Sequence, residues 1–159
     1  MSDWYWFRVL GEPVGKGRPR FSTRGGSPRA YTPAKTRRYE QDVQAAAREA
    51  IPEPIRGPVE LEIRAVHGVP DSWPKWKREM ARSGDLAPTG KPDASNVLKA
   101  IEDAINGVAW YDDAQVVDMT IRREYTGPGA ASSVPAVRVI VRALERAGSS
   151  EAKTKEGAT

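Results

Sequence analysis

Two different hydrophobic periodicities in one short chain restrict its fold more than any other feature. Residues 59–66, VELEIRAV, alternate apolar and polar side chains, which is typical of a strand with one buried face. Residues 94–106 instead repeat apolar side chains at helical spacing. On a helical projection the following fall within an arc of about 120°: Val97, Leu98, Ile101, Ala104 and Ile105. A chain with both patterns is expected to pack helices against a sheet.

The remaining segments extend this prediction. Residues 4–10 are aromatic and β-branched and predict a first strand. A helix is expected to begin at Thr32–Pro33, with Thr32 as N-cap and Pro33 in the first helical position. A short basic helix is expected over 71–84, opening with Ser72 as its cap. Its Trp73 and Trp76 could lie in the core or on DNA, and we expect the core. The helix of 94–106 is expected to end at Asn106-Gly107.

Two further strands are predicted near the C-terminus. Residues 114–126 and 134–144 alternate in the β pattern, and the loop GPGAASS is expected to join them as a hairpin with Val117, Met119 and Ile121 facing inward. The predicted fold class is therefore α+β: a single domain over 1–145, with a mixed sheet, helices on one face and a C-terminal β-hairpin. The tail, residues 146–159, has no apolar periodicity and is expected to be disordered.

Composition excludes several classes of protein. The 159 residues contain no cysteine, which rules out disulfides, thiolate catalysis and cysteine-based zinc sites. His67 is the only histidine, so sites built on histidine pairs are excluded, and it is expected to end a strand. No apolar run approaches 18 residues and the N-terminus does not have the pattern of a secretory signal. We therefore expect no membrane partner and a cytoplasmic location.

A basic segment interrupts the regular pattern near the N-terminus. Residues 13–39 contain no acid, and Gly and Pro recur through GKGRPRFSTRGGSPRAYTP, which excludes a regular helix or central strand. One interpretation is a solvated loop. The one we favour is an arm that grips phosphates, with Phe21 or Tyr31 available to stack on a base. The basic residues are Lys16, Arg18, Arg20, Arg24, Arg29, Lys35, Arg37 and Arg38.

Acidic residues occur at two places in the second half of the chain. Asp93 follows Pro92 at the start of the predicted helix, and alone it would be an N-cap. Asp112 and Asp113 precede a strand, and alone they would be turn residues. Together they predict an oxygen-rich site for Mg²⁺, which binds through one or two carboxylates and borrows phosphate oxygens from its substrate. Lys99 lies on the polar face of the helix, where it could stabilise charge on a phosphoryl group.

Two segments carry a family resemblance. KPDASNVLKAIEDAINGVAWYDDAQVVD (91–118) and PVGKGRPRF…YTPAKTRRYE (13–40) resemble the RusA family of Holliday junction resolvases from bacteria and phages, and the similarity runs through most of 5–143. By this resemblance Asp93 and Asp113 match catalytic aspartates of the family. Lys99 matches the lysine that is important in the family, and Asn96 matches the asparagine of its motif. Asp112 is the acidic neighbour of Asp113.

The resemblance implies a function and a set of site residues. It implies Mg²⁺-dependent homodimers, with Mn²⁺ as an expected substitute, that cut four-way DNA junctions by two symmetric phosphodiester hydrolyses during recombination and repair. The expected catalytic residues are Asp93, Asp113 and Lys99, and the expected metal ligands are Asp93, Asp113, Asp112 and Ser95. The expected DNA contacts are Lys16, Arg18, Arg20, Arg24, Arg29 and Asn96. The expected location is the cytoplasm of a bacterium or of a phage-infected cell.

Ser95 departs from the family pattern, because a second catalytic aspartate usually stands there. Three possibilities follow. The site works with two aspartates and waters; Glu102, seven residues on, supplies the missing carboxylate; or the protein binds junctions and cuts them poorly. For Glu102 an i, i+3 pairing with Lys99 is the simpler expectation. The alternative function is therefore a non-catalytic or weakly catalytic branched-DNA-binding protein.

Overall fold

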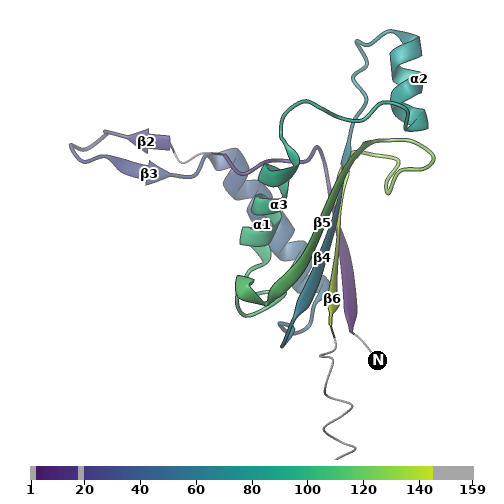
Figure 1. Ribbon diagram of the computed structural model, residues 1–159. Helices are drawn as coiled ribbons and strands as arrows, with labels where there is room; N and C mark the ends of the chain where they lie inside the picture. The colour runs from purple at the N-terminus through teal and green to yellow at the C-terminus, as the bar shows by residue number, and fades with distance from the viewer. Residues whose placement is uncertain (1–2, 18–19, 145–159) are drawn as a thin grey trace, which may run out of the picture.

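A four-stranded mixed sheet forms the centre of the fold (Figure 1). A computed structural model describes residues 3–17 and 20–144 of the chain. The strands are β1 Trp4–Leu10, β4 Val59–His67, β5 Val116–Tyr125 and β6 Ala136–Ala143, in the spatial order β1-β6-β4-β5. β4 and β5 run parallel, whereas β6 is antiparallel to both β1 and β4. The predicted α+β class with a mixed sheet is confirmed.

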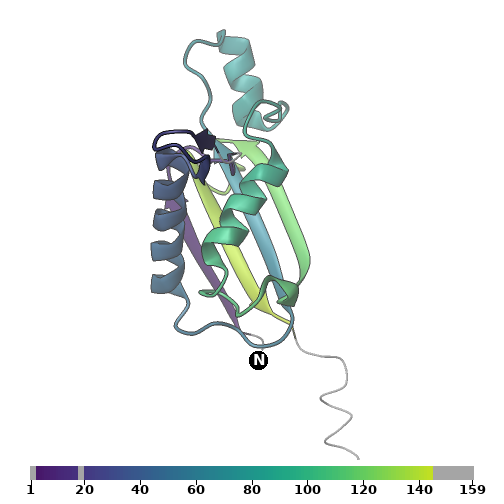
Figure 2. The ribbon, with the colours of Figure 1, turned by 90° about the vertical axis from the view of Figure 1, so that its left-hand side faces the viewer.

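Two helices cover one face of this sheet (Figure 2). They are α1 Ala34–Ala50 and α3 Ala94–Ile105, and α2 Lys75–Ser83 stands apart at one end of the sheet. Val59, Leu61 and Ile63 of β4 are fully buried beneath the helices, as the alternation in 59–66 predicts. The sheet and the two helices therefore share one core, and the expected placement of helices on one face is confirmed.

The predicted C-terminal hairpin is wrong. β5 and β6 are not neighbours, because β4 lies between them and pairs with both. The loop of residues 126–135 is long enough to cross one strand, so sequence proximity did not decide the pairing. β4 lies in the interior of the sheet, where its apolar side chains Val59, Leu61 and Ile63 are fully buried.

The inward orientation predicted for β5 is also wrong in part. Val117 is 62% exposed and Met119 is 40% exposed, whereas Ile121 is half-buried against the core. Among the described strands β5 is at the edge, with β4 as its one neighbour, and a register shift at Val59/Glu60 sets Val117 out of the pairing with β4. Two apolar side chains of β5 are therefore left on the surface.

Proline shifts two helix starts from their predicted positions. α1 begins at Ala34 with Pro33 as N-cap, and α2 begins at Lys75 with Pro74 as N-cap. Pro33 and Pro74 have extended backbone, with ψ of 142° and 153°, so each stands just outside its helix. Thr32 and Ser72 therefore lie too early in the chain to cap α1 and α2. The end of α3 is as predicted: Asn106 is the C-cap and Gly107 has a φ of +81°.

The two tryptophans near α2 differ in their surroundings. Trp73 is half-buried and its ring meets Tyr125 edge-on at a centroid distance of 5.5 Å. Trp76 is 62% exposed, so the expectation that it lies in the core is wrong. The helix stands apart from the main core, which leaves room for only one of the two rings to pack.

Some predictions fall outside the part of the chain that the structure describes. These are the tail, residues 146–159, and Arg18 in the basic segment. Within the described residues, no helix combines the length and the apolar character needed to cross a bilayer.

Candidate nuclease site

Asp93 lies at the N-terminus of α3 and caps it. Its Oδ1 accepts a hydrogen bond from the backbone N–H of Asn96 at 2.8 Å, and its Oδ2 accepts one from the Asn96 side-chain amide at 3.2 Å. The side chain is 51% exposed, and the Lys91 ammonium lies 4.0 Å from Oδ2. The carboxylate is therefore held in place by the helix, yet it is open to a ligand from solvent.

The other motif residues of α3 follow Asp93 along the helix. Ser95 and Lys99 are exposed, whereas Asn96 is half-buried. Val97, Ala100, Ile101, Ala104 and Ile105 are buried against the sheet, so the helical spacing of apolar residues fixes which side the motif residues occupy. α3 thus presents one carboxylate, one hydroxyl and one ammonium near its N-terminal half.

Asp113 lies at the start of a 3₁₀ turn, Asp113–Gln115, that leads into β5. Its Oδ1 accepts a hydrogen bond from Trp110 Nε1 at 2.9 Å, and the Trp110 ring is fully buried. Asp112 caps the turn by accepting from the Ala114 N–H at 2.8 Å. Asp112 is therefore engaged in local structure, while Trp110 sets the direction of Asp113.

Gln115 is a site-positioning residue whose role the sequence did not indicate. Its Oε1 accepts from the N–H groups of Tyr111 and Asp112, at 2.8 and 3.0 Å. Its Nε2 donates to the carbonyls of Ile55 and Gly57, both at 2.8 Å. The oxygen of the Gln115 side-chain amide thus holds the residues just before the 3₁₀ turn, and its nitrogen ties the turn to the chain before β4. The only signal in the sequence was its place in the segment 91–118, which carries the family resemblance.

Glu102 lies close enough to Asp113 to sense its charge. Burial raises the pKa of Glu102, the charges of Asp113 and Asp103 raise it further, and Lys99 partly offsets the rise. Among the described residues, Glu102 forms no ion pair with Lys99, so the i, i+3 pairing is not formed in this structure. Glu102 and Asp113 are thus a second acidic group, at the C-terminal end of α3.

Asp93 lies at the N-terminal end of α3, whereas Glu102 and Asp113 lie at its C-terminal end. α3 has 12 residues, and at about 1.5 Å per residue its length is about 18 Å. The turn that carries Asp113 lies beyond the end of the helix opposite Asp93 (Figures 1 and 2). Within the described residues, no three Asp, Glu, His or Cys side chains come together as a metal site. The residues of one protomer therefore do not fit a Mg²⁺ ion held by both Asp93 and Asp113.

Gly15 and Lys16, which we call the arm root because the basic segment continues from them, pack directly on α3. The backbone N–H of Lys16 donates to the Asn96 carbonyl at 2.9 Å. Gly15 approaches so closely that a Cβ there would lie 2.7 Å from the Pro92 Cβ and 3.1 Å from the Asn96 Cβ. Only glycine fits this contact, so the arm leaves the body beside Asp93.

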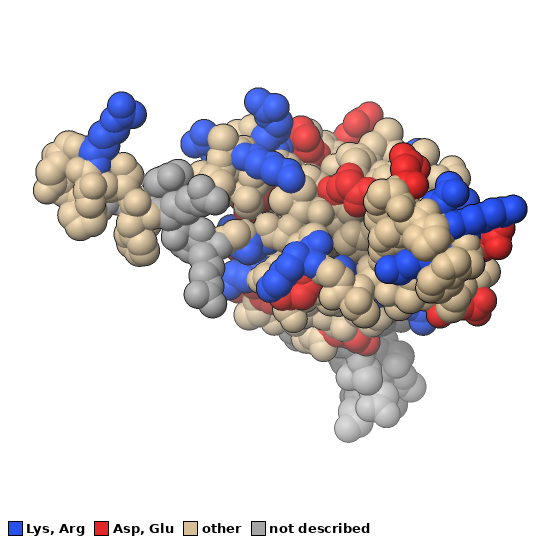
Figure 3. Space-filling view, turned by 90° about the horizontal axis from the view of Figure 1, so that it is seen from above, with Lys and Arg blue, Asp and Glu red and all other residues tan. Residues whose placement is uncertain are grey.

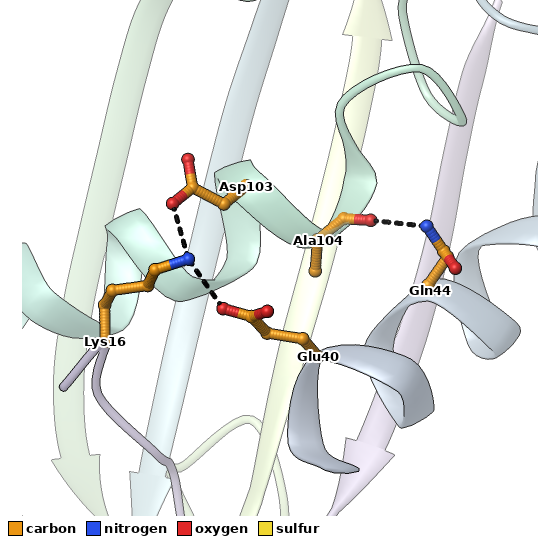
Figure 4. Close-up of polar contacts among 5 residues, drawn as sticks. All are labelled: Lys16, Glu40, Gln44, Asp103 and Ala104. Atoms are coloured by element: carbon orange, nitrogen blue, oxygen red, sulfur yellow. Dashed lines mark hydrogen bonds and ion pairs between the residues drawn. The ribbon is translucent and has the colours of Figure 1, made fainter. Parts of the chain in front are cut away.

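Lys16 joins three elements at this point (Figure 4). Its ammonium lies 2.9 Å from Glu40 of α1 and 3.0 Å from Asp103 of α3. Burial lowers the pKa of Lys16, but the hydrogen bonds with Glu40 and Asp103 raise it more, so the pKa lies above its ordinary value. Lys16 therefore forms part of the body of the protein, and its expected contact with DNA stays a prediction.

We expect Lys16→Met to lower the free energy of unfolding by about 1 kcal/mol, because it removes two ion pairs that are only partly screened by water. Lys35→Met is the matched control, since Lys35 is an exposed lysine on α1. Urea unfolding of both variants measures the difference. Equal stability of the two would show that the Lys16 contacts do not hold the arm root to the body.

Beyond its root the basic segment forms a projecting hairpin (Figure 1). β2 Arg20–Ser22 pairs antiparallel with β3 Arg29–Tyr31, and Phe21 lies opposite Ala30. Phe21 is 75% exposed, because alanine offers it little cover. Figure 3 shows basic and no acidic side chains on the visible face of this hairpin. Sequence analysis missed the two short strands but predicted the basic arm.

His67 has a structural place. It ends β4 as predicted, it is 8% exposed, and its Nε2 accepts a hydrogen bond from Arg123 Nε at 3.2 Å. Burial and the charge of Arg123 lower the pKa of His67 to about 4, so the ring is neutral at pH 7. Arg123 also donates to the Gly90 carbonyl, which ties β5 to the loop before Asp93.

Comparison with known proteins identifies a family and a relative of this chain. Residues 11–141 match the family described as Endodeoxyribonuclease RusA. The chain is also 40% identical over 139 residues to a Bacillus subtilis (strain 168) protein named "Uncharacterized protein YqaN". The aligned residues make up 86% of this chain and 94% of that protein. The family match spans the arm root, α3, the Asp113 turn, β4, β5 and most of β6, whereas β1 lies before it. The chain therefore belongs to the RusA endodeoxyribonuclease family.

Proposed function

We propose that the protein is a Mg²⁺-dependent endodeoxyribonuclease that resolves four-way DNA junctions by paired, symmetric phosphodiester hydrolysis. It acts as a homodimer in the recombination and repair of DNA, in the cytoplasm of a bacterium or of a phage-infected cell. The observation that carries the proposal is the family match across the segment that holds Asp93, Asn96, Lys99 and Asp113. A homodimer suits the reaction, because two equivalent sites are needed to nick two opposed strands.

Hydrolysis of a phosphodiester needs a water, a charge-neutralised phosphate and a leaving oxygen. The water oxygen bonds to phosphorus, one P–O bond breaks, and the departing oxygen takes up a proton, so that one phosphate end and one hydroxyl end remain. The chemistry that a bound Mg²⁺ supplies is neutralisation of phosphate charge and activation of water. The exposed Lys99 would add a positive charge beside the phosphate.

Ser95 makes this site poor in charge. A hydroxyl can ligate a cation or hold a water, but it adds no negative charge, and a hard cation gains less from fewer carboxylates. We therefore propose a site that needs more Mg²⁺ than one with three aspartates and that accepts Mn²⁺ well. Glu102 does not supply the missing carboxylate within its own protomer, since it lies near Asp113 at the other end of α3.

The hairpin arm is the proposed grip on the DNA backbone. Its residues include Arg18, Arg20, Arg24 and Arg29, and its root packs beside Asp93. A two-stranded ribbon fits the width of the major groove, and an exposed aromatic such as Phe21 can stack on an unpaired base. The arm would thus deliver phosphates to the end of α3 where Asp93 lies.

We expect replacement of both Arg18 and Arg20 by alanine to weaken binding to all junction sequences alike. The slope of log affinity against log salt should flatten by about one unit for each lost phosphate contact. Fluorescence anisotropy over a salt series measures this, with Arg48→Ala as the control because Arg48 lies in the last turn of α1, away from the arm. An unchanged slope would remove the arm from the account of DNA binding.

A non-catalytic DNA-binding protein is the second candidate. It is favoured by one observation: both oxygens of Asp93 are already engaged with Asn96, as in an ordinary helix cap. Incubation of a labelled synthetic junction, and of a linear duplex of the same sequence, with and without Mg²⁺ separates the two. The proposed enzyme cuts the junction only with the metal, whereas the alternative binds it and leaves it intact.

A further inference from the structure

α2 is a projecting helix that the chain inserts just before Asp93. Residues 68–74 lead to it from the end of β4, and residues 84–92 lead from its end to Asp93. In Figures 1 and 2 α2 stands at the end of the sheet from which the arm also projects, and the start of α3 lies between the two. The reaction proposed above uses no residue of α2, so the two sides of the helix show what it is suited to bind.

The inner side of α2 is fixed to the body of the protein. Trp73, just before the helix, meets Tyr125 of β5 edge-on at 5.5 Å, and the Lys77 ammonium lies 4.0 Å from the centre of the Trp73 ring. Gly127, in the chain after β5, packs so closely on the Arg82 backbone that a Cβ there would overlap it. α2 is therefore held in one orientation, and its outer side can position a ligand relative to Asp93.

The outer side of α2 exposes a tryptophan beside basic residues. Trp76 and Met80 are 62% and 39% exposed, and they lie on one side of the helix because they are about one turn apart. Lys75 and Arg82 are exposed beside them, about two turns apart along the neighbouring stripe. Glu79 lies between these two bases, 3.8 Å from Lys75 in an exposed pair. This side of α2 thus offers an aromatic ring and two cations to a ligand.

Positive charge predominates on α2 and continues to Asp93. The helix carries more bases than acids: Lys75, Lys77, Arg78 and Arg82 against Glu79. Within the described ranges neither Arg78 nor Arg82 forms an ion pair, and Arg78 Nε is buried there without a hydrogen-bond partner. Lys91, whose side chain is 90% exposed, carries the charge on to Asp93. Figure 3, which views the molecule from the end where α2 stands, shows basic side chains at the arm and again on the opposite side of this face. The charge of this surface is complementary to a phosphate backbone.

We infer that α2 is a second DNA-binding element, on the side of Asp93 opposite to the arm. Lys75 and Arg82 contact phosphates of the strand that is cut, and Trp76 stacks on a base of that strand at the point where the strands exchange. The arm and α2 then hold the DNA on both sides of the scissile phosphate, which lies over the start of α3. The inference rests on the proposed nuclease function and adds a contact that the grip by the arm does not contain.

The chemistry of the outer side favours DNA over a partner protein. A helix that docks in a protein groove presents a continuous apolar stripe, with anchors at i, i+3, i+4 and i+7. On this side α2 exposes two apolar residues, Trp76 and Met80, with charged side chains beside both. Aromatic rings next to basic side chains are the usual components of surfaces that bind unpaired nucleic acid. We therefore assign DNA, rather than another protein, as the partner of α2.

Replacement of both Lys75 and Arg82 by alanine tests the phosphate contacts. Both side chains are exposed, so the variant should fold as the parent does. The slope of log affinity for a junction against log salt should flatten by about two units. Arg8→Ala combined with Arg48→Ala is the control, because it removes the same charge from exposed positions on β1 and α1. A slope that changes equally in both variants, or in neither, would overturn the inference.

Variants of Trp76 test the stacking contact. Trp76→Ala should weaken binding to a four-way junction by about 5- to 150-fold, which is the loss of one stacked base. Binding to a linear duplex of the same sequence should stay nearly unchanged, because its bases are paired and stacked on each other. Trp76→Phe should restore most of the junction affinity, since a ring remains, and Trp4→Ala is the matched control, since Trp4 is 57% exposed on β1. Fluorescence anisotropy gives the affinities. Equal junction affinity of Trp76→Ala and the parent would show that the exposed ring serves another partner.

The failures of the two proposals can be told apart. A parent protein that leaves junctions intact in both Mg²⁺ and Mn²⁺ refutes the proposed nuclease, whatever the α2 variants do. A parent that cuts junctions, together with α2 variants that bind them as the parent does, refutes the inference alone.

A tethered reagent locates α2 on the DNA without relying on nuclease activity. The chain has no cysteine, so Glu79→Cys on α2 and Thr23→Cys on the arm each give one exposed thiol for attachment of iron–EDTA. Without Mg²⁺, radicals formed at the iron should cut the DNA close to the position of the parent's nick, on one side of it from α2 and on the other side from the arm. Glu49→Cys, exposed on α1, is the control and should give no local scission. Scission from α2 that is no stronger than this control, or that falls on the same side as scission from the arm, would overturn the inference.

Discussion

Asp93→Asn is expected to reduce junction cleavage by more than about 100-fold. Even residues that only orient a metal ligand are worth about 10–100-fold, so loss of the ligand's own charge should cost more. Junction affinity should be kept or improved, because the substitution removes a negative charge that repels phosphate. Single-turnover cleavage and anisotropy with the same labelled junction measure the two quantities.

The helix cap provides the control for this variant. Asparagine caps a helix about as well as aspartate, so Asp93→Asn should leave the stability of α3 nearly unchanged. Asp93→Ala removes the cap as well, which should lower the free energy of unfolding by about 0.5–2 kcal/mol. Wild-type cleavage by Asp93→Asn would mean that Asp93 is only a cap and that the metal site lies elsewhere.

Trp110→Ala is expected to have the largest effect on stability. Its ring is fully buried, and removal of a buried tryptophan side chain costs about 3–5 kcal/mol. This is a large share of the roughly 5–15 kcal/mol by which a domain is stable. The variant also removes the donor to Asp113, so cleavage should fall even under conditions where the variant is folded.

Trp76→Ala is the matched control, because the same side chain is 62% exposed there. An exposed substitution of this kind changes stability by about 0.5 kcal/mol or less. Chemical unfolding of both variants gives the comparison. A similar small loss in both would show that Trp110 does not hold the Asp113 turn to the core.

The sequence predicted those elements whose periodicity is set by burial. β4 and α3 have apolar residues at the spacing of a strand and of a helix, and both form where expected. The sequence did not predict the order of the strands or the exposure of β5, because these depend on which strands pair with each other. The pattern of β5 is that of a half-buried strand, but its position at the edge leaves Val117 exposed, and β4 takes the place that a hairpin would have given to β6.

The candidate site was predicted as a set of residues but not as an arrangement. The motif identified Asp93, Lys99 and Asp113, and the local signals for a cap and a turn were both correct. Spacing along the chain could not show that the helix between them separates the two aspartates. The roles of Gln115 and Trp110 depend on contacts with Ile55, Gly57 and the core, which no local pattern contains.

Mapping of nicks on a synthetic four-way junction tests the central claim most directly. Each strand of the junction is end-labelled in turn, and the products formed with Mg²⁺, with Mn²⁺ and with a chelator are separated at nucleotide resolution. The account predicts one nick in each of two opposed strands, at positions related by the two-fold symmetry of the junction. It predicts no nick in the reaction that contains the chelator. An intact junction in both metals, at protein concentrations that saturate binding, would contradict it.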